Sequence, residues 1–171
     1  MYSTQSGSAG NTTAQSNPNN SLGGYMSTTQ WTGGTLNDLF SDITGDENAD
    51  LQVDYRCIFL QNTNGTLTLL SPVLWIASEV AGGADIALGM DPTAASAIGT
   101  SSAQAVTVAN SLTAPSGVTF SSPTTFSGGI SMGNLPAGQC VAFWFKRTAT
   151  NSAALNNDGV TINDEFLALA A

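Results

Sequence analysis

The chain has 171 residues, with 12 acidic and three basic side chains, no histidine and a formal net charge of −9. Three basic residues cannot form the basic stripe that nucleic-acid binding requires, and they give little attraction to an anionic membrane surface. No apolar run approaches the roughly 18 residues that span a bilayer. We therefore expect neither nucleic acid nor a membrane as a partner.

Charged residues make up 9% of the chain, far below the roughly 25% of a typical soluble domain. Such a composition is typical of many short strands joined by turns, and of a surface that partners largely cover. The missing histidine excludes Ser-His-Asp and Cys-His catalysis and most catalytic zinc sites. Twelve acids make some close carboxylate pair inevitable, so a pair is weak evidence for hydrolysis. We expect no enzyme, no catalytic residues and no cofactor.

Residues 1–30 form a low-complexity segment that is rich in Ser, Thr, Asn, Gln and Gly and has no charged side chain. It has no basic and apolar regions of a secretory signal, so we expect none. Its few apolar residues follow no period, and in isolation such a segment should be disordered. We interpret 1–30 as an extended N-terminal arm and 31–171 as the folded domain. The alternative to disorder is an arm that becomes ordered across a neighbouring subunit.

A short helix is predicted next, because four apolar residues recur at helical spacing: Leu36, Leu39, Phe40 and Ile43. Thr35 is the expected N-cap, and Gly45 would end the helix. Five carboxylates then fall within residues 42–54: Asp42, Asp46, Glu47, Asp50 and Asp54. They could hold Ca²⁺, but their spacing fits no EF-hand. We favour a solvated acidic loop and expect no metal site.

Strands are predicted where apolar runs lie between turn residues: 55–61, 66–70, 73–78, 84–90, 105–109, 126–132, 135–147 and 160–169. Asn64-Gly65 predicts a hairpin between the first two strands. The run from Cys140 to Phe145 is apolar at both alternating sets of positions, which predicts a central strand covered on both faces. Residues 54–62 have the same character, so we expect both segments in one core.

Two cysteines, Cys57 and Cys140, lie within these predicted core strands. We favour two buried reduced thiols, and a bridge between neighbouring strands is the alternative. Among the tryptophans, Trp75 and Trp144 lie inside apolar strands and are expected in the core. Trp31, beside two glycines, is expected to be exposed. One exposed ring is thin evidence for sugar binding.

Short strands at intervals of roughly 8–12 residues, with little helix between them, predict an all-β fold. The expected architecture is a single antiparallel β-sandwich with the N-terminal arm. The pattern alone does not separate a jelly roll from an immunoglobulin-like sandwich. The chain length favours the jelly roll, since immunoglobulin-like domains are nearer 100 residues.

Five segments follow one another in a recognisable order and spacing: 39–45 (LFSDITG), 54–62 (DYRCIFLQN), 73–76, 135–147 (LPAGQ into an aromatic strand ending in Lys-Arg) and 154–158. Over roughly residues 36–162, this order resembles a group of virion proteins of tailed bacteriophages. It implies a structural component of the virion without enzymatic activity. The chain departs from that group in its arm and in residues 93–130.

Low charge and an acidic balance suit a protein on the outside of a shell, because the DNA-facing inside favours basic residues. We therefore expect a capsid decoration (cement) protein on the major capsid protein lattice, self-associating as a homotrimer. Its expected location is the exterior of the phage head, after assembly in the host cytoplasm. The alternative is a tail, baseplate or fibre-associated protein that contacts host glycans or a receptor. A free lectin-like module is a third class, which would need a secretion route.

Overall fold

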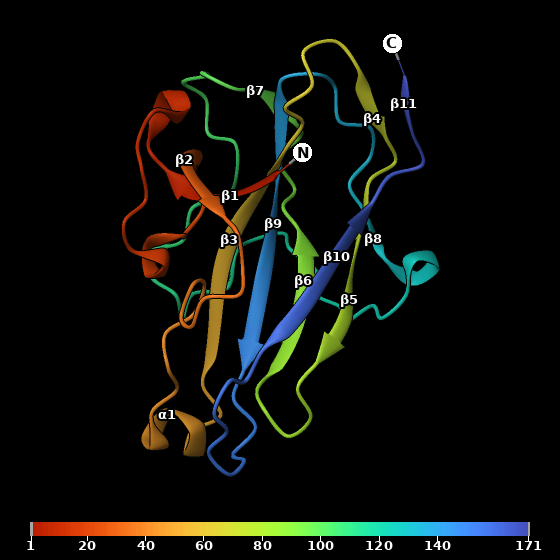
Figure 1. Ribbon diagram of the computed structural model, residues 1–171. Helices are drawn as coiled ribbons and strands as arrows, with labels where there is room; N and C mark the ends of the chain where they lie inside the picture. Colours follow the sequence, from red (N-terminus) through yellow and green to blue (C-terminus); the bar gives the residue numbers. More distant parts are fainter. Residues whose placement is uncertain (1, 171) are drawn as a thin grey trace.

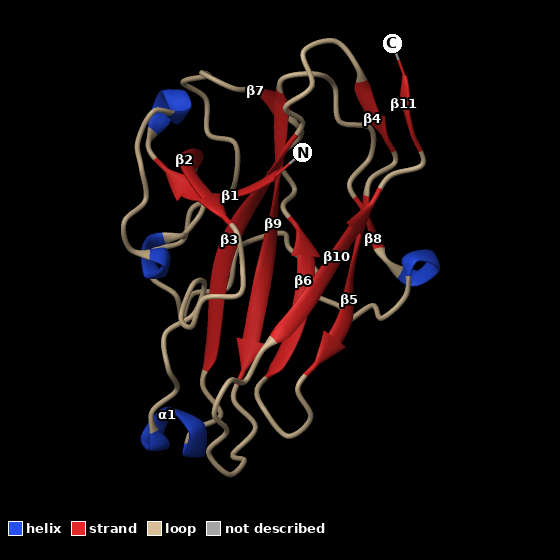
Figure 2. Cartoon of the chain, in the orientation of Figure 1, coloured by secondary structure: helices blue, strands red, loops and turns tan. Residues whose placement is uncertain are grey.

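The computed structural model describes residues 2–170 and is built almost entirely from strands (Figure 1; Figure 2). The strands are β1 (Tyr2–Gly7), β2 (Tyr25–Trp31), β3 (Val53–Gln61), β4 (Thr68–Leu70), β5 (Val73–Glu79), β6 (Asp85–Met90), β7 (Ser96–Ala97), β8 (Ile130–Ser131), β9 (Gln139–Thr148), β10 (Val160–Glu165) and β11 (Ala168–Ala170). The helices are α1 (Gly45–Ala49) and three 3₁₀ turns, η1 (Ala9–Asn11), η2 (Pro18–Asn20) and η3 (Phe126–Gly128).

Two antiparallel sheets form the body of the molecule. The large sheet has the order β2-β1-β3-β9-β6, with β7 added to β9. The small sheet has the order β10-β5-β8, and its strand β10 crosses in front of β6 (Figure 1). A separate ribbon of β4 and β11 lies at the end of the molecule that holds the C-terminus. The predicted all-β sandwich is confirmed, and the jelly-roll topology stays a prediction.

Strand β9 is the central strand that the sequence predicts. It pairs with β3 over nine consecutive positions, from Val53 opposite Thr148 to Gln61 opposite Cys140. On one face its residues enter the core between the two sheets: Val141, Phe143 and Phe145. On the other face its residues enter a second core, which irregular segments cover: Cys140, Ala142 and Trp144. Both faces are therefore buried, and polar residues are confined to the strand's ends.

The N-terminal segment differs from the expected arm. Strand β1 lies inside the large sheet, between β2 and β3, and β2 runs across the expected boundary at residue 30. The buried Ser21 hydroxyl donates to the carbonyl of Cys57 at 2.6 Å, and the Cys57 N–H donates to the carbonyl of Ser21 at 2.7 Å. Backbone pairing and buried hydroxyls thus order a polar segment whose composition alone predicts disorder.

The helix predicted over residues 36–43 is wrong. The backbone turns there because Asn37 has a left-handed conformation, with a φ of 61°. The α-helix begins later, where Thr44 and Glu47 form a capping box: the Thr44 hydroxyl accepts from the N–H of Glu47, and the Glu47 carboxylate accepts from the N–H of Thr44.

The hairpin predicted at Asn64-Gly65 is also wrong, because β3 and β4 belong to different sheets. The buried Asn62 amide donates to the carbonyls of Leu67 and Leu135, at 2.8 and 2.9 Å. These bonds turn the chain out of the large sheet and hold it beside the segment that leads into β9. The turn residues after β3 therefore carry the chain from one sheet to another and do not form a hairpin.

The two cysteines are free and buried, as favoured from the sequence. Cys57 lies opposite Trp144, and Cys140 lies opposite Gln61. The two are thus four positions apart along the paired strands, roughly 13 Å, and a bridge needs Cα atoms within about 7 Å. Burial raises the pKa of the Cys57 thiol well above its usual value and that of Cys140 to about 12.

Candidate functional site

A groove opens at the end of the sandwich that carries α1. Its two walls are the segments 33–45 and 152–161, and its floor includes Trp31, Ile86 and Arg147. Its volume is about 1250 Å³. In this region the small sheet stops short and an irregular segment completes the front layer (Figure 1). We call this hollow the acidic groove, because four of its lining residues are carboxylates: Asp38, Asp42, Glu79 and Asp158.

The first wall is fixed to the large sheet through Trp31 and Asp38. The Trp31 ring packs edge-to-face on Phe145, with ring centroids 5.4 Å apart, and its Nε1–H donates to Asp38 Oδ2 at 2.9 Å. The Gln5 amide donates to the carbonyl of Asp38 at 3.1 Å. Burial raises the pKa of the Asp38 carboxyl, and the bond from Trp31 opposes this shift. Segment 33–45 is therefore a braced wall although it has no regular secondary structure before Gly45.

Two buried arginines hold the same wall from below. Arg147 forms an ion pair with Asp54, with 2.8 Å between Nη2 and Oδ2, and donates from Nη1 to the carbonyl of Ser41. Arg56 donates from Nε to the carbonyl of Leu39. Both guanidinium carbons lie over the Phe40 ring, Arg147 at 4.6 Å and Arg56 at 5.2 Å from its centroid. The arginine charges thus serve the protein's own backbone and carboxylates.

The burial of these arginines determines the charge of the surface. Arg56 is 2% exposed and Arg147 is 9% exposed. Desolvation lowers the pKa of Arg56 to about 10, so it stays charged at neutral pH. Within the described chain, Lys146 is then the one basic side chain with more than slight exposure. The few charged groups on the outer surface are therefore almost all carboxylates.

The second wall is tied to the turn between β5 and β6. Asp158 Oδ2 accepts from the N–H of Ala84 at 2.7 Å, and the Thr150 hydroxyl donates to the carbonyl of Gly83 at 2.8 Å. Glycine at position 83 leaves room for the Asp158 carboxylate, because a Cβ there would collide with that carboxylate unless it moved. Glu79 accepts from the N–H of Ile86 at 2.6 Å, and burial raises the pKa of its carboxyl.

The rim of the acidic groove carries three exposed apolar side chains. Leu36 is 67%, Leu155 44% and Val80 40% exposed, and all three line the groove. Leu36 and Leu155 lie on opposite walls. A hollow with apolar rims and carboxylate lining offers van der Waals contact and hydrogen-bond acceptors. This arrangement suits binding of an apolar and cationic group.

The acidic residues that we considered for calcium have separate roles. Glu47 caps α1 and Asp54 pairs with Arg147. Over residues 2–170 no three His, Cys, Asp or Glu side chains are grouped as a metal site would need. The three tryptophans differ in burial. Trp144 is buried as predicted, whereas Trp75 is partly exposed and packs edge-to-face on Phe126, with centroids 5.7 Å apart. Trp31, expected to be exposed, is partly buried.

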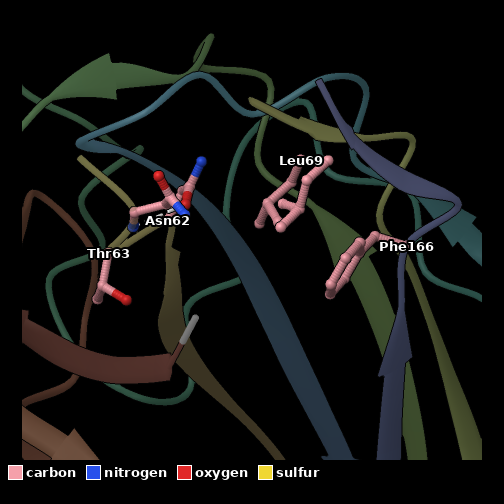
Figure 3. A pocket seen from close by; sticks show the side chains of 6 residues that line it. Asn62, Thr63, Leu69 and Phe166 are labelled. Atoms are coloured by element: carbon pink, nitrogen blue, oxygen red, sulfur yellow. Dashed lines mark hydrogen bonds between the residues drawn. The ribbon is translucent and has the colours of Figure 1, made fainter. Parts of the chain in front are cut away.

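A smaller hollow of about 320 Å³ lies near the β4–β11 ribbon (Figure 3). Leu69, Leu169 and Phe166 provide its apolar lining, and Asn62 provides polar atoms. The Asn62 amide nitrogen already donates to two backbone carbonyls. The Asn62 amide nitrogen therefore stabilises the fold, and we assign no ligand to this hollow.

Comparison with protein-family models, with curated proteins and with solved structures finds no match. The class that the fold defines is an antiparallel β-sandwich with an acidic groove at one end. None of the helices in residues 2–170 has the length and hydropathy to cross a membrane. The sequence does not predict the acidic groove, because its walls are mostly irregular segments about 110 residues apart along the chain.

Proposed function

We propose that the protein is a structural virion component, a capsid decoration (cement) protein of a tailed bacteriophage. On this proposal the β-sandwich binds the outer surface of the major capsid protein lattice and stabilises the head. The protein acts by binding and has no enzymatic activity. It associates with copies of itself as a homotrimer.

The observation that carries the proposal is the burial of both arginines in a chain with three basic residues. The remaining surface is anionic and poor in charge overall, so packaged DNA would repel it. A position outside the shell suits such a surface. Exposed apolar side chains on the groove rim supply a contact for a protein partner. The resemblance to phage virion proteins points in the same direction.

On this proposal the N-terminal segment is not the surface that attaches the protein to the capsid. Residues 2–7 are inside the large sheet, so they are not free to reach a neighbouring capsomer. The acidic groove is the more suitable contact, since it combines exposed apolar groups with walls that are already ordered.

The test is the stoichiometry of this protein relative to the major capsid protein in purified particles. A ratio near 1:1 supports a decoration protein that covers the lattice. Adding the purified protein to shells that lack it should restore that ratio and raise the temperature at which the shells disrupt. A protein absent from particles, or present without any effect on shell stability, contradicts the proposal.

The second candidate is a tail, baseplate or fibre-associated protein that contacts glycans. The partly exposed Trp75, with Phe126 beside it and Asn163 opposite it on β10, favours this candidate, since exposed rings stack on sugars. A copy number below about one tenth of the major capsid protein would favour the tail. Loss of glycan-array binding in Trp75→Ala would then assign the aromatic pair.

A further inference from the structure

The apolar rim of the acidic groove is arranged for a partner that enters between its walls. Leu36 projects from the first wall, whereas Leu155 and Val80 belong to the opposite side. Their exposure leaves apolar surface in water, and a partner that covers this surface removes an unfavourable contact. The walls are braced by Trp31, Arg147 and Asp158, so little ordering is needed on binding.

The charge of the acidic groove restricts what that partner can be. Asp42 is exposed and has no internal cation near enough for an ion pair, and the described chain contains a single ion pair, Asp54 with Arg147. Nucleic acid would be repelled. Among its described residues, a second copy of this chain would present one basic side chain that is not buried, the partly exposed Lys146. The complementary occupant is therefore a different protein that carries Lys or Arg beside apolar residues.

The edge of the small sheet adds backbone groups to the same place. Strand β10 is an edge strand that pairs with β5 alone among the described strands. Its first two residues, Val160 and Thr161, line the acidic groove. An extended chain can add to such an edge through main-chain hydrogen bonds, while alternate side chains enter the adjoining hollow.

We propose that the acidic groove binds an extended segment of the capsid lattice in which Lys or Arg alternates with apolar residues, and that this segment pairs with the edge of β10. The inference rests on the proposed function for the identity of the partner. The chemistry of the segment rests on the groove alone. Its apolar side chains enter the hollow between Leu36 and Leu155, and its cations, on the outer face of the segment, lie near the exposed carboxylates of Asp42 and Glu79.

The first probe is a synthetic peptide of eight residues, blocked at both ends, in which Lys alternates with Val. The matched control has Glu in place of Lys. Titration calorimetry with the full chain should show binding of the Lys peptide, weaker at high salt, and at least tenfold weaker binding of the Glu peptide. The second probe is purified shells of the major capsid protein that lack this protein.

The variants are Asp42→Lys and Leu155→Ser. Asp50→Lys is the control for charge, since Asp50 is exposed and lies outside the groove. Leu112→Ser is the control for apolar exposure, since Leu112 is 56% exposed and also lies outside it. Each groove variant should bind the Lys peptide about tenfold more weakly than the wild type does, and each control variant about twofold more weakly at most. Equal melting temperatures show that the variants are folded.

The two probes separate the inference from the proposed function. If the groove variants bind both probes as the wild type does, the inference is overturned while the decoration function stands. If the wild type binds the Lys peptide but no shells, the decoration function fails and the groove chemistry stands. If the groove variants lose binding to the peptide and to the shells while the control variants keep it, the result supports the inference and the proposed function.

Discussion

Arg147 and Asp54 form an ion pair in which the side chains are 11% and 7% exposed, with 2.8 Å between nitrogen and oxygen. The pair joins the ends of the two most central strands, since Asp54 lies opposite Arg147 in the register of β3 and β9. It also holds Ser41 of the groove wall through the second Arg147 nitrogen. One buried pair therefore couples the central strands to the candidate site.

Removing one partner of this pair should be strongly destabilising. Asp54→Ala leaves a buried guanidinium without its counter-charge, and the expected loss in the free energy of unfolding is about 3–5 kcal/mol. Urea denaturation measures it. The matched control is Asp50→Ala at an exposed position, where a change within about 0.5 kcal/mol is expected. A similar small loss in both variants would show that the pair contributes little.

Deleting residues 1–30 should unfold the sandwich. The deletion removes β1 and all of β2 except Trp31, uncovers the edge of β3 and exposes the second core around Trp144. Circular dichroism against temperature should show no cooperative transition. A truncated protein that melts like the full chain would restore the arm that the sequence predicts.

A single substitution tests the contact between the N-terminal segment and β3. Ser21→Ala removes the hydroxyl that bonds to the Cys57 carbonyl, and the expected cost is about 1–3 kcal/mol because the partner atom is buried. Ser16→Ala is the exposed control and should change the stability little.

Three carboxyls should contribute more to stability as the pH falls from neutral through their raised pKa values. Burial raises the folded-state pKa of Asp38, Glu79 and Asp164, so each charged carboxylate opposes folding above that pKa. Protonation removes this opposition as the pH falls through the raised values. Glu47 acts in the opposite direction, because its bonds to Thr44 lower its pKa and their contribution is lost in stronger acid.

Melting temperatures at several pH values check this dependence. Asp38→Asn and Glu79→Gln should each flatten the rise, because neither amide titrates. A profile that is the same in both variants and in the wild type would remove these two carboxyls as its source.

Neither cysteine should react with a thiol reagent in the native protein. Both thiols are buried and burial raises both pKa values, that of Cys140 to about 12. The reactive thiolate is therefore scarce and inaccessible. Two thiols should react once denaturant is added. Rapid labelling of either cysteine in the native state would contradict the packing of the second core.

Gly83→Ala should displace the Asp158 carboxylate and loosen the second wall of the acidic groove. The expected loss is about 1–3 kcal/mol, the usual cost of a buried N–H left without its acceptor. Gly65→Ala is the control, because a Cβ there meets nothing. In an Asp158→Ala background, Gly83→Ala should cost much less, and equal costs in both backgrounds would show that the collision is unimportant.

The central strands could be predicted from sequence because their signal is strong. Residues 54–62 and 140–145 are apolar at both alternating sets of positions, which leaves a doubly covered strand as the simplest solution. Strand β1 could not be predicted, because Thr4, Gln5 and Ser6 are buried by backbone pairing and carry no hydrophobic pattern. Composition predicts which apolar segments are buried, but it does not predict strands made of polar residues.

The sequence prediction of the helix follows the apolar pattern over residues 36–43 and is wrong. The true start carries a local signal of its own, because Thr44 and Glu47 have the spacing of a capping box. The acidic groove had no such signal. It depends on the contact of Trp31 with Asp38 and on two walls brought together by the sheets, and neither follows from local pattern.

The place of β1 in the large sheet has a consequence for the order of events during synthesis. Its neighbour β3 leaves the ribosome dozens of residues later, and β9, which completes the sheet, follows only at Gln139–Thr148. Pairings between segments so distant in sequence form slowly, since a long loop must close before any contact stabilises it. The nascent N-terminal segment has few apolar side chains that could associate wrongly during this delay. Its polar composition thus keeps an early strand soluble until its late partners arrive.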